Sequence, residues 1–149
     1  MGVDIEVGPD FVIVSKTDSL HPVKIKTQGY PGFATDLQQP VTVLLTQCEG
    51  DSILEETVYE NRFKNVPYLN QMGASIEISE KRIKIHGLTP LKGEKVEATD
   101  LRAGACLVLA GLIADGITTI TNIGPVLRGY EHLVEKLTDV GASISLKEV

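Results

Sequence analysis

Two aspartates occupy matching places in the sequence and could carry chemistry. Asp36 lies in residues 34–38 (ATDLQ) and Asp100 in residues 98–102 (ATDLR), each at the start of a predicted apolar helix. Aspartate is a favoured cap at a helix start, and such a cap stabilises the helix by about 1 kcal/mol. A carboxylate at the edge of a cleft can instead accept a proton from a hydroxyl group. Both interpretations stay open, and the more elaborate loop before Asp36 favours Asp36 as the reacting carboxylate.

Three arginines allow two interpretations in the same way. Arg62 and Arg128 lie at equivalent places beside the start of a predicted helix, and Arg102 follows the second aspartate. A guanidinium group near the partially positive end of a helix suits the binding of a phosphate or carboxylate. Ion pairs between these arginines and the two aspartates are the alternative.

All these residues belong to an internal repeat, so the elements around them should recur as well. Each unit predicts a strand, a helix, a strand, a helix and a closing β-structure, in that order. In the first unit these elements are expected at residues 22–27, from 36 onwards, at 52–59, in a helix that follows a turn over 60–63 and runs to about 72, and at 74–78 paired with 83–85. In the second unit they are expected at 95–98, 100–114, 118–123, 129–140 and 143–146. A hairpin of residues 3–7 and 11–14 precedes both units and matches the hairpin of the first unit.

The first helix of the first unit should begin near Asp36. Thr35 and Gln38 have the spacing of a capping box, as do Asp36 and Gln39. Pro40 is tolerated only in a first helical turn, which agrees with this start. The apolar residues that follow predict a helix that is buried on most sides.

The repeat predicts an α/β fold built from β-α-β-α-β-β units. No linker rich in Pro, Gly or Ser divides the chain, so residues 1–149 are predicted to form a single partial domain. Its parts are the closing hairpin of a truncated unit (1–20), one unit (21–86) and a second unit (87–149). Because the chain starts at the tail of a repeat, we expect it to be the C-terminal piece of a longer protein.

Composition argues against several classes of function. The formal net charge is -6, without a basic patch, which disfavours nucleic-acid binding. The longest apolar run, about residues 103–114, is too short to span a bilayer, and a cytoplasmic protein is expected. Cys48 and Cys106 are expected to be small buried residues, not members of a disulfide framework. His21, His86 and His132 lack the spacing of metal ligands, so no metal site is predicted.

Five motifs in order cover most of the chain. They are YPGFATDLQ at residues 30–38, ENRF at 60–63, NQMGA at 70–74, TDLRA at 99–103 and LRGYE at 127–131. Together they resemble the family of UDP-N-acetylglucosamine 1-carboxyvinyltransferases, the enolpyruvyl transferases of peptidoglycan synthesis. The resemblance implies two similar domains, each of three β-α-β-α-β-β units in an inverse α/β barrel-like fold, with the active site between the domains.

The resemblance also implies an activity for the complete protein. Family enzymes transfer the enolpyruvyl group of phosphoenolpyruvate to the 3-hydroxyl of UDP-N-acetylglucosamine and release phosphate, the first committed step of peptidoglycan synthesis. No metal or organic cofactor is implied. The implied partners are the two substrates and the missing N-terminal part of the same protein, where the reactive cysteine of the family lies.

Site residues follow from the resemblance by motif. Asp36 is similar to the carboxylate that binds the sugar hydroxyl and is the proposed general base. Val58 is similar to the residue whose backbone contacts the sugar nucleotide, and Arg128 to the arginine that binds phosphoenolpyruvate. A charged cluster that lines the same cleft corresponds to Arg62, Asp100 and Arg102.

A non-catalytic binding or scaffold module with the same repeat fold is the alternative function. If the enzyme interpretation holds, the 149-residue chain alone is expected to lack transferase activity, because half of the cleft is absent. Helices that are apolar on most sides also predict an uncovered apolar face, so the isolated chain is expected to self-associate.

Overall fold

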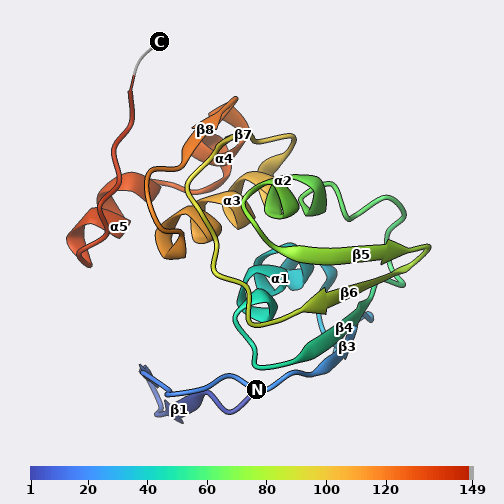
Figure 1. Ribbon diagram of the computed structural model, residues 1–149. Helices are drawn as coiled ribbons and strands as arrows, with labels where there is room; N and C mark the ends of the chain where they lie inside the picture. Colours follow the sequence, from blue (N-terminus) through green and yellow to red (C-terminus); the bar gives the residue numbers. More distant parts are fainter. Residues whose placement is uncertain (148–149) are drawn as a thin grey trace.

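The computed structural model describes residues 1–147, which form three small β-sheets around a central group of helices (Figure 1). The strands are β1 (Asp4–Val7), β2 (Val12–Ser15), β3 (Lys24–Lys26), β4 (Asp51–Glu55), β5 (Ser75–Ser79), β6 (Arg82–His86), β7 (Lys95–Glu97) and β8 (Thr119–Thr121). The helices are α1 (Gln38–Thr46), α2 (Val66–Gln71), α3 (Leu101–Ile113), α4 (Gly124–Gly129) and α5 (Leu133–Asp139), and a 3-10 helix over Thr35–Leu37 leads into α1. No helix in this part of the chain is long and apolar enough to cross a membrane.

The largest sheet has the strand order β3-β4-β6-β5. β3 and β4 are parallel and are connected through α1, whereas β6 pairs antiparallel with both β4 and β5. Leu54, Ile83 and Ile85 are buried in one hydrophobic core with residues of α1 and α2. The sheet therefore has one face on the core and one face toward solvent, as its alternation of apolar and polar residues requires.

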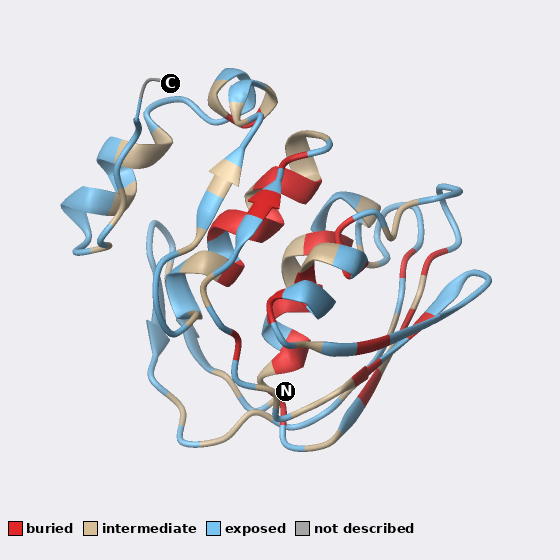
Figure 2. Ribbon diagram, turned by 45° about the horizontal axis from the view of Figure 1, so that its top comes forward, coloured by how far each residue is buried: buried red, intermediate tan, exposed pale blue. Residues whose placement is uncertain are grey.

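The core lies where α1 packs against α3 in the centre of the molecule. Figure 2 shows buried residues along these two helices and at intervals along the strands of the largest sheet, with exposed residues on the loops and the outer ends of the strands. Leu45 of α1 and Leu107 of α3 are both fully buried. Burying a leucine side chain contributes about 1.5–3 kcal/mol, so this helix pair is a major source of stability.

The predicted internal repeat is visible in the topology. The segments β3-α1-β4 and β7-α3-β8 are both parallel strand pairs connected through a helix. The hairpins β1-β2 and β5-β6 have the same register, because Ile5 pairs with Val14 as Ile76 pairs with Ile85. The predictions of an α/β architecture and of two matching hairpins are therefore confirmed.

The second unit differs from its predicted form after β8. The predicted helix over 129–140 is confirmed only in part, as α5 (Leu133–Asp139), because the chain breaks around His132, whose φ is +52°, and a separate short helix α4 ends at Gly129. The sequence predicted no helix at residues 124–128, but α4 has Pro125 in its first turn, where proline is tolerated. The predicted strand over 143–146 is wrong, since residues 142–147 form no strand and no described segment offers them a pairing partner.

The second strand of the first unit is shorter than predicted, because β4 ends at Glu55 instead of continuing to residue 59. The second helix, α2, begins at Val66 with Pro67 in its first turn, after the predicted turn over residues 60–63. The side chain of Glu56 accepts hydrogen bonds from the backbone N–H groups of Val58 and Tyr59, which turns the chain away from the sheet. The segment between β4 and α2 is therefore a shaped loop that carries Val58 and Arg62.

Both cysteines are buried and neither forms a disulfide, which confirms that they act as small core residues. Cys106 lies in α3, while Cys48 lies just beyond α1 and not in its interior. Burial raises the pKa of the Cys106 thiol to about 12. The thiol therefore stays protonated near neutral pH and is a poor nucleophile.

Candidate active-site edge around Asp36

The carboxylate of Asp36 meets two arginines that come from distant parts of the chain. Its Oδ1 accepts a hydrogen bond from Nε of Arg102 at 2.6 Å and one from Nη2 of Arg62 at 3.2 Å. Asp36 lies on the 3-10 helix before α1, Arg62 on the loop between β4 and α2, and Arg102 in the first turn of α3. The fold thus joins three of the predicted site residues in one charged cluster, and the ion-pair interpretation is confirmed for these two arginines.

Asp36 does not cap its helix, so the capping-box predictions for this start are wrong. Neither the 3-10 helix nor α1 has a side-chain hydrogen bond at its N-cap. Asp36 sits within the 3-10 turn, and its side chain remains 62% exposed. The hydrogen bond from Arg102 and the positive charges of both arginines outweigh burial and hold the pKa of Asp36 below its usual range. The carboxylate is therefore ionised at neutral pH and able to accept a proton or a hydrogen bond.

Asp100, in contrast, is the cap of α3, which confirms the capping interpretation at this position. Its Oδ1 accepts from the backbone N–H groups of Arg102 at 3.0 Å and of Ala103 at 2.9 Å. The extended backbone of Asp100 is that of an ordinary N-cap residue. Asp100 therefore fixes the first turn of the helix from which Arg102 reaches Asp36.

Arg62 is held on several sides. Its Nε donates to Oγ1 of Thr35 at 3.3 Å, and its guanidinium lies over the ring of Tyr59, 4.5 Å from the centroid. Its backbone carbonyl accepts a hydrogen bond from Nε2 of Gln39 at 2.8 Å. A guanidinium over an aromatic face gains cation–π attraction, so Arg62 is oriented before any ligand arrives.

Arg128 is not where the sequence predicted it. It lies in the last turn of α4 and is exposed, so it stands at the partially negative end of a helix and not beside a helix start. The argument from the helix dipole therefore fails for Arg128. Gly129 packs so closely on Leu101 that an added Cβ would lie 2.4 Å from Cδ1 of that leucine. This contact places the segment of Arg128 beside the start of α3, although none of the described contacts links Arg128 to Asp36.

Val58 lies in the exposed loop after β4. Its backbone N–H is used by Oε1 of Glu56 at 2.8 Å. Within residues 1–147 no hydrogen bond reaches its carbonyl oxygen. A ligand can therefore meet this backbone only through the carbonyl.

Sequence reasoning missed Glu56, which the structure places at the centre of this region. The residue is 2% exposed, and its carboxylate accepts from Thr27, Thr35, Val58 and Tyr59. Burial by itself raises the pKa of Glu56, but these donors together outweigh burial and hold the pKa below its usual range. The available signal was the pair of adjacent acidic residues, Glu55 and Glu56, in the predicted strand segment ILEETV at residues 53–58. Side chains alternate along a strand, so one of the two must turn inward, where a buried charge needs donors.

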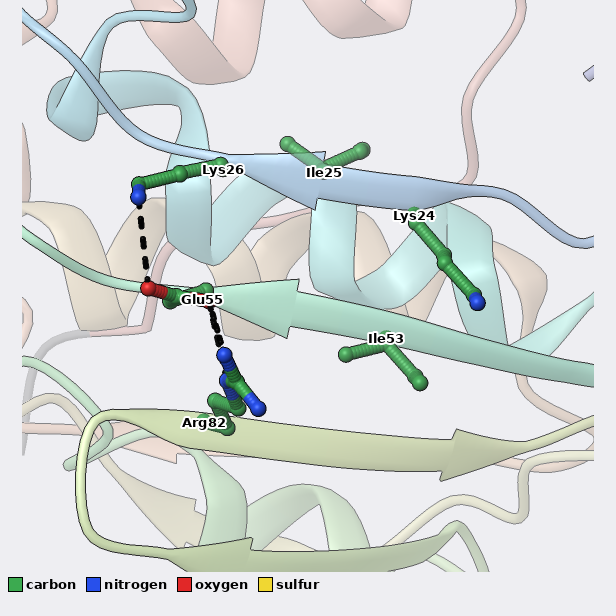
Figure 3. A pocket seen from close by; sticks show the side chains of 6 residues that line it. All are labelled: Lys24, Ile25, Lys26, Ile53, Glu55 and Arg82. Atoms are coloured by element: carbon green, nitrogen blue, oxygen red, sulfur yellow. Dashed lines mark hydrogen bonds and ion pairs between the residues drawn. The ribbon is translucent and has the colours of Figure 1, made fainter.

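A hollow on the outer face of the largest sheet contains none of the predicted site residues. It is lined by Lys24, Ile25, Lys26, Ile53, Glu55 and Arg82, and Figure 3 shows Glu55 between Lys26 and Arg82. The cluster around Asp36 lies elsewhere, at an exposed edge. Among the described residues, no group of three His, Cys, Asp or Glu side chains could hold a metal ion.

The sequence and the fold define the class of this protein. The sequence model for EPSP synthase (3-phosphoshikimate 1-carboxyvinyltransferase) matches residues 1–137, so the chain belongs to that family. Among curated relatives, UDP-N-acetylglucosamine 1-carboxyvinyltransferase 2 of Geobacillus kaustophilus is 50% identical over 144 residues, which are 97% of this chain and 34% of that protein. The enzyme of the same name from Streptococcus thermophilus (strain ATCC BAA-250 / LMG 18311) is 52% identical over 148 residues, or 99% of this chain and 35% of that protein. The chain thus spans about a third of the length of these relatives.

Solved structures agree with this assignment. The crystal structure of the enolpyruvyl transferase NikO from Streptomyces tendae matches with a TM-score of 0.91 and 34% identity, over 97% of this chain and 34% of that one. EPSP synthase from Acinetobacter baumannii matches with a TM-score of 0.69 and 19% identity, over 99% of this chain and 35% of that one. The second likeness shows the fold alone, and both support the predicted enolpyruvyl transferase architecture.

Proposed function

We propose that this chain is the C-terminal part of a UDP-N-acetylglucosamine 1-carboxyvinyltransferase. The observation that carries the proposal is the Asp36 carboxylate, which two arginines clamp through Oδ1 only. No described contact uses Oδ2, so this oxygen is available to a substrate hydroxyl. Relatives of that name at about half identity support the choice of substrate over other enolpyruvyl acceptors.

In this proposal Asp36 accepts the proton of the sugar 3-hydroxyl as its oxygen attacks C2 of phosphoenolpyruvate and C3 takes up a proton. Loss of a proton from C3 and departure of phosphate from C2 then restore the double bond and give the enolpyruvyl ether. The ion pairs with Arg62 and Arg102 orient the carboxylate before the substrate binds. Because these pairs also stabilise the ionised form, they lower its strength as a base while they keep it ready to accept. The carbonyl of Val58 is proposed to contact the sugar nucleotide, and Arg128 to bind the carboxylate or phosphate of phosphoenolpyruvate.

The proposal gives Asp100 and Arg102 different tasks from those of a simple charged lining. Asp100 caps the first turn of α3 and so fixes the position of Arg102. The guanidinium of Arg102 in turn orients the carboxylate of Asp36. Neither needs to touch the substrate for this. No cofactor is proposed, since the transfer needs only acid–base and electrostatic help.

The remaining partner of the chain is proposed to be the rest of the same polypeptide. The β1-β2 hairpin exposes apolar side chains, with Val7 73%, Val12 62% and Val14 63% exposed. An exposed two-stranded hairpin of this kind is stable only when another surface covers it. We propose that the isolated chain self-associates through such faces and that the complete protein works in the cytoplasm, where peptidoglycan precursors support cell shape and division.

A phosphate-release assay tests the proposed function. The complete protein that carries this chain is incubated with phosphoenolpyruvate and UDP-N-acetylglucosamine, and the 149-residue chain is assayed beside it. We expect phosphate release and enolpyruvyl transfer with the complete protein only. A complete, folded protein that binds UDP-N-acetylglucosamine but transfers nothing would instead favour a non-catalytic binding module.

A further inference from the structure

Glu56 is the first residue after β4, and its side chain points to the opposite face from that of its neighbour. Glu55 lies on the outer face of the sheet, where its carboxylate meets Nη2 of Arg82 at 2.8 Å and Nζ of Lys26 at 3.5 Å (Figure 3). Glu56 turns inward, because successive side chains of an extended chain alternate in direction. Its backbone N–H still donates to the carbonyl of Lys81 at 2.7 Å, which fixes the residue to the end of the sheet.

One oxygen of Glu56 organises the loop that carries Val58. Oε1 accepts from the backbone N–H groups of Val58 at 2.8 Å and Tyr59 at 3.0 Å, and from Oγ1 of Thr27 at 2.9 Å. Oγ1 of Thr27 in turn accepts from the backbone N–H of Thr57 at 2.9 Å. Three consecutive backbone N–H groups of this loop therefore depend, directly or through one hydroxyl, on a single carboxylate oxygen.

The other oxygen of Glu56 organises the turn that carries Asp36. Oε2 accepts from Oγ1 of Thr35 at 2.9 Å. A threonine hydroxyl has one hydrogen and two lone pairs, so a donation to Glu56 leaves the lone pairs for another donor. Nε of Arg62 uses one of them at 3.3 Å, while Nη2 of the same guanidinium reaches Asp36.

No lysine or arginine forms an ion pair with Glu56 within the described residues, so its buried charge is compensated by hydrogen-bond donors alone. Such donors favour the ionised form, and a neutral group in the same place could not accept from all of them. The residue is thus more than a filler of space. A group of this kind fixes the relative position of every segment that donates to it.

We propose that Glu56 is a positioning residue that couples the two sugar-nucleotide contacts of the site. Its carboxylate holds the Asp36 turn with one oxygen and the Val58 loop with the other. The inference rests on the proposed function, because the roles of Asp36 and Val58 come from it. Loss of either half of the bridge should loosen the sugar-nucleotide site and leave the phosphoenolpyruvate site nearly intact.

The test uses the complete protein and separates the two halves of the bridge. In Glu56→Gln, the amide oxygen can still serve the three donors on the Val58 side, but its NH2 group faces Thr35 and forces that hydroxyl to accept. In Thr35→Val, the link to the Asp36 turn is removed directly, and Thr35→Ser should restore it. Glu55→Gln is the matched control, since Glu55 faces the other side of the same strand end.

We expect Glu56→Gln and Thr35→Val each to raise the KM for UDP-N-acetylglucosamine about tenfold or more, with the KM for phosphoenolpyruvate changed by less than about threefold. Thr35→Ser and Glu55→Gln should stay within about twofold of wild type in both constants. A general loss of packing would not produce this split between the substrates. If Glu56→Gln does not fold, the comparison of Thr35→Val with Thr35→Ser decides.

The outcomes keep this inference apart from the proposed function. If the wild-type protein transfers enolpyruvyl and Thr35→Val leaves both KM values unchanged, only the role of Glu56 is overturned. Equal rises in both KM values would also overturn it, because they indicate general disorder of the site. Folded wild-type protein without transferase activity overturns the proposed function, and the role of Glu56 falls with it.

Discussion

The two repeats carry an aspartate at the same place in sequence and use it in different ways. In the second repeat Asp100 precedes α3 and gives its carboxylate to two backbone N–H groups of the first turn. In the first repeat a 3-10 turn intervenes, Asp36 lies inside it, and the carboxylate reaches two arginine side chains instead. One short extra turn thus separates an aspartate that stabilises a helix from one whose exposed carboxylate pairs with two arginines.

The cluster around Asp36 also shows that neither repeat makes the site alone. Arg102 belongs to the second repeat, and the Asp100 cap holds the helical turn from which it extends. The packing of α1 against α3 brings this turn to the first repeat. The repeat therefore places two versions of the same motif side by side, one whose aspartate caps a helix and one whose aspartate pairs with arginine side chains.

The largest difference between the two aspartates should appear in turnover. In the complete protein, Asp36→Asn removes the proton acceptor, and we expect kcat to fall by about 10²–10⁴-fold, as is typical for loss of a general base. Asp100→Asn should lower kcat far less, because asparagine also caps helices. Steady-state phosphate release measures both. Turnover of Asp36→Asn near that of wild type would mean that Asp36 is not the base.

The helix of the second repeat should tolerate alanine at one glycine and not at another. A Cβ at Gly104 would lie 2.2 Å from Cγ2 of Val126, where α4 packs on α3, so Gly104→Ala should lower the free energy of unfolding by about 1–3 kcal/mol. Gly111→Ala is the matched control, because its nearest neighbours are side-chain atoms of Thr118 at 3.2–3.5 Å. Alanine gains about 1 kcal/mol in helix propensity at such a site. Urea denaturation of both variants measures the contrast, and equal stabilities would show that α4 does not need close approach at Gly104.

The free energy of unfolding should depend more on Asp100 than on Asp36, which is the reverse of the order expected for turnover. Asp100→Ala removes a cap that makes two hydrogen bonds, and we expect a loss of about 1 kcal/mol in the free energy of unfolding. Asp36→Ala removes two ion pairs whose carboxylate is 62% exposed, and solvent screening limits their contribution to about 0–1 kcal/mol. Thermal and chemical denaturation measure both. A larger loss for Asp36→Ala would contradict the division of tasks between the repeats.

The smallest expected effect is a pH dependence that belongs to the first repeat. Nδ1 of His86, on β6, lies 2.9 Å from Oδ1 of Asp51, and its Nε2 lies 3.1 Å from Oε1 of Glu77. The hydrogen bond to Asp51, which has the larger effect, and the one to Glu77 together raise the pKa of His86 above 6.5 in the folded state. This contribution to stability is therefore complete below pH 6.5 and is lost as pH rises through the folded-state pKa.

The variant His86→Gln should remove this part of the pH dependence. Wild-type stability should decline slightly above pH 6.5, and that decline should be weaker in His86→Gln, which cannot titrate. Denaturation midpoints at several pH values measure the difference. Parallel curves for the two proteins would show that the pair of carboxylates does not favour the charged imidazole.

The sequence predicted the fold where the repeat gave each element a second copy. The hairpins β1-β2 and β5-β6, the long helix α3 and the strand pairs around α1 and α3 are all confirmed. The errors fall where the second copy diverges, as in α4, or where a side-chain hydrogen bond turns the chain early, as Glu56 does after β4. The end of β4 is set there by a specific side-chain-to-backbone contact, which strand propensity does not contain.

The candidate site was predictable in its residue types and less so in its geometry. Charge and spacing identified Asp36, Arg62, Asp100, Arg102 and Arg128, and the motif resemblance added Val58. They could not tell which aspartate caps a helix, because that depends on the 3-10 turn before α1. They also missed Glu56, since its importance lies in four donors from three separate segments.

The most direct test of the difference between the two aspartates is a ¹³C NMR titration of the side-chain carboxyl groups with UDP-N-acetylglucosamine. The complete protein is labelled at aspartate carboxyl carbons, and Asp36→Asn and Asp100→Asn assign the two signals. We expect the Asp36 signal to shift in a saturable way, while the Asp100 signal stays in place as a helix cap should. Movement of the Asp100 signal with a stationary Asp36 signal would contradict the assignment of the reacting carboxylate to the first repeat.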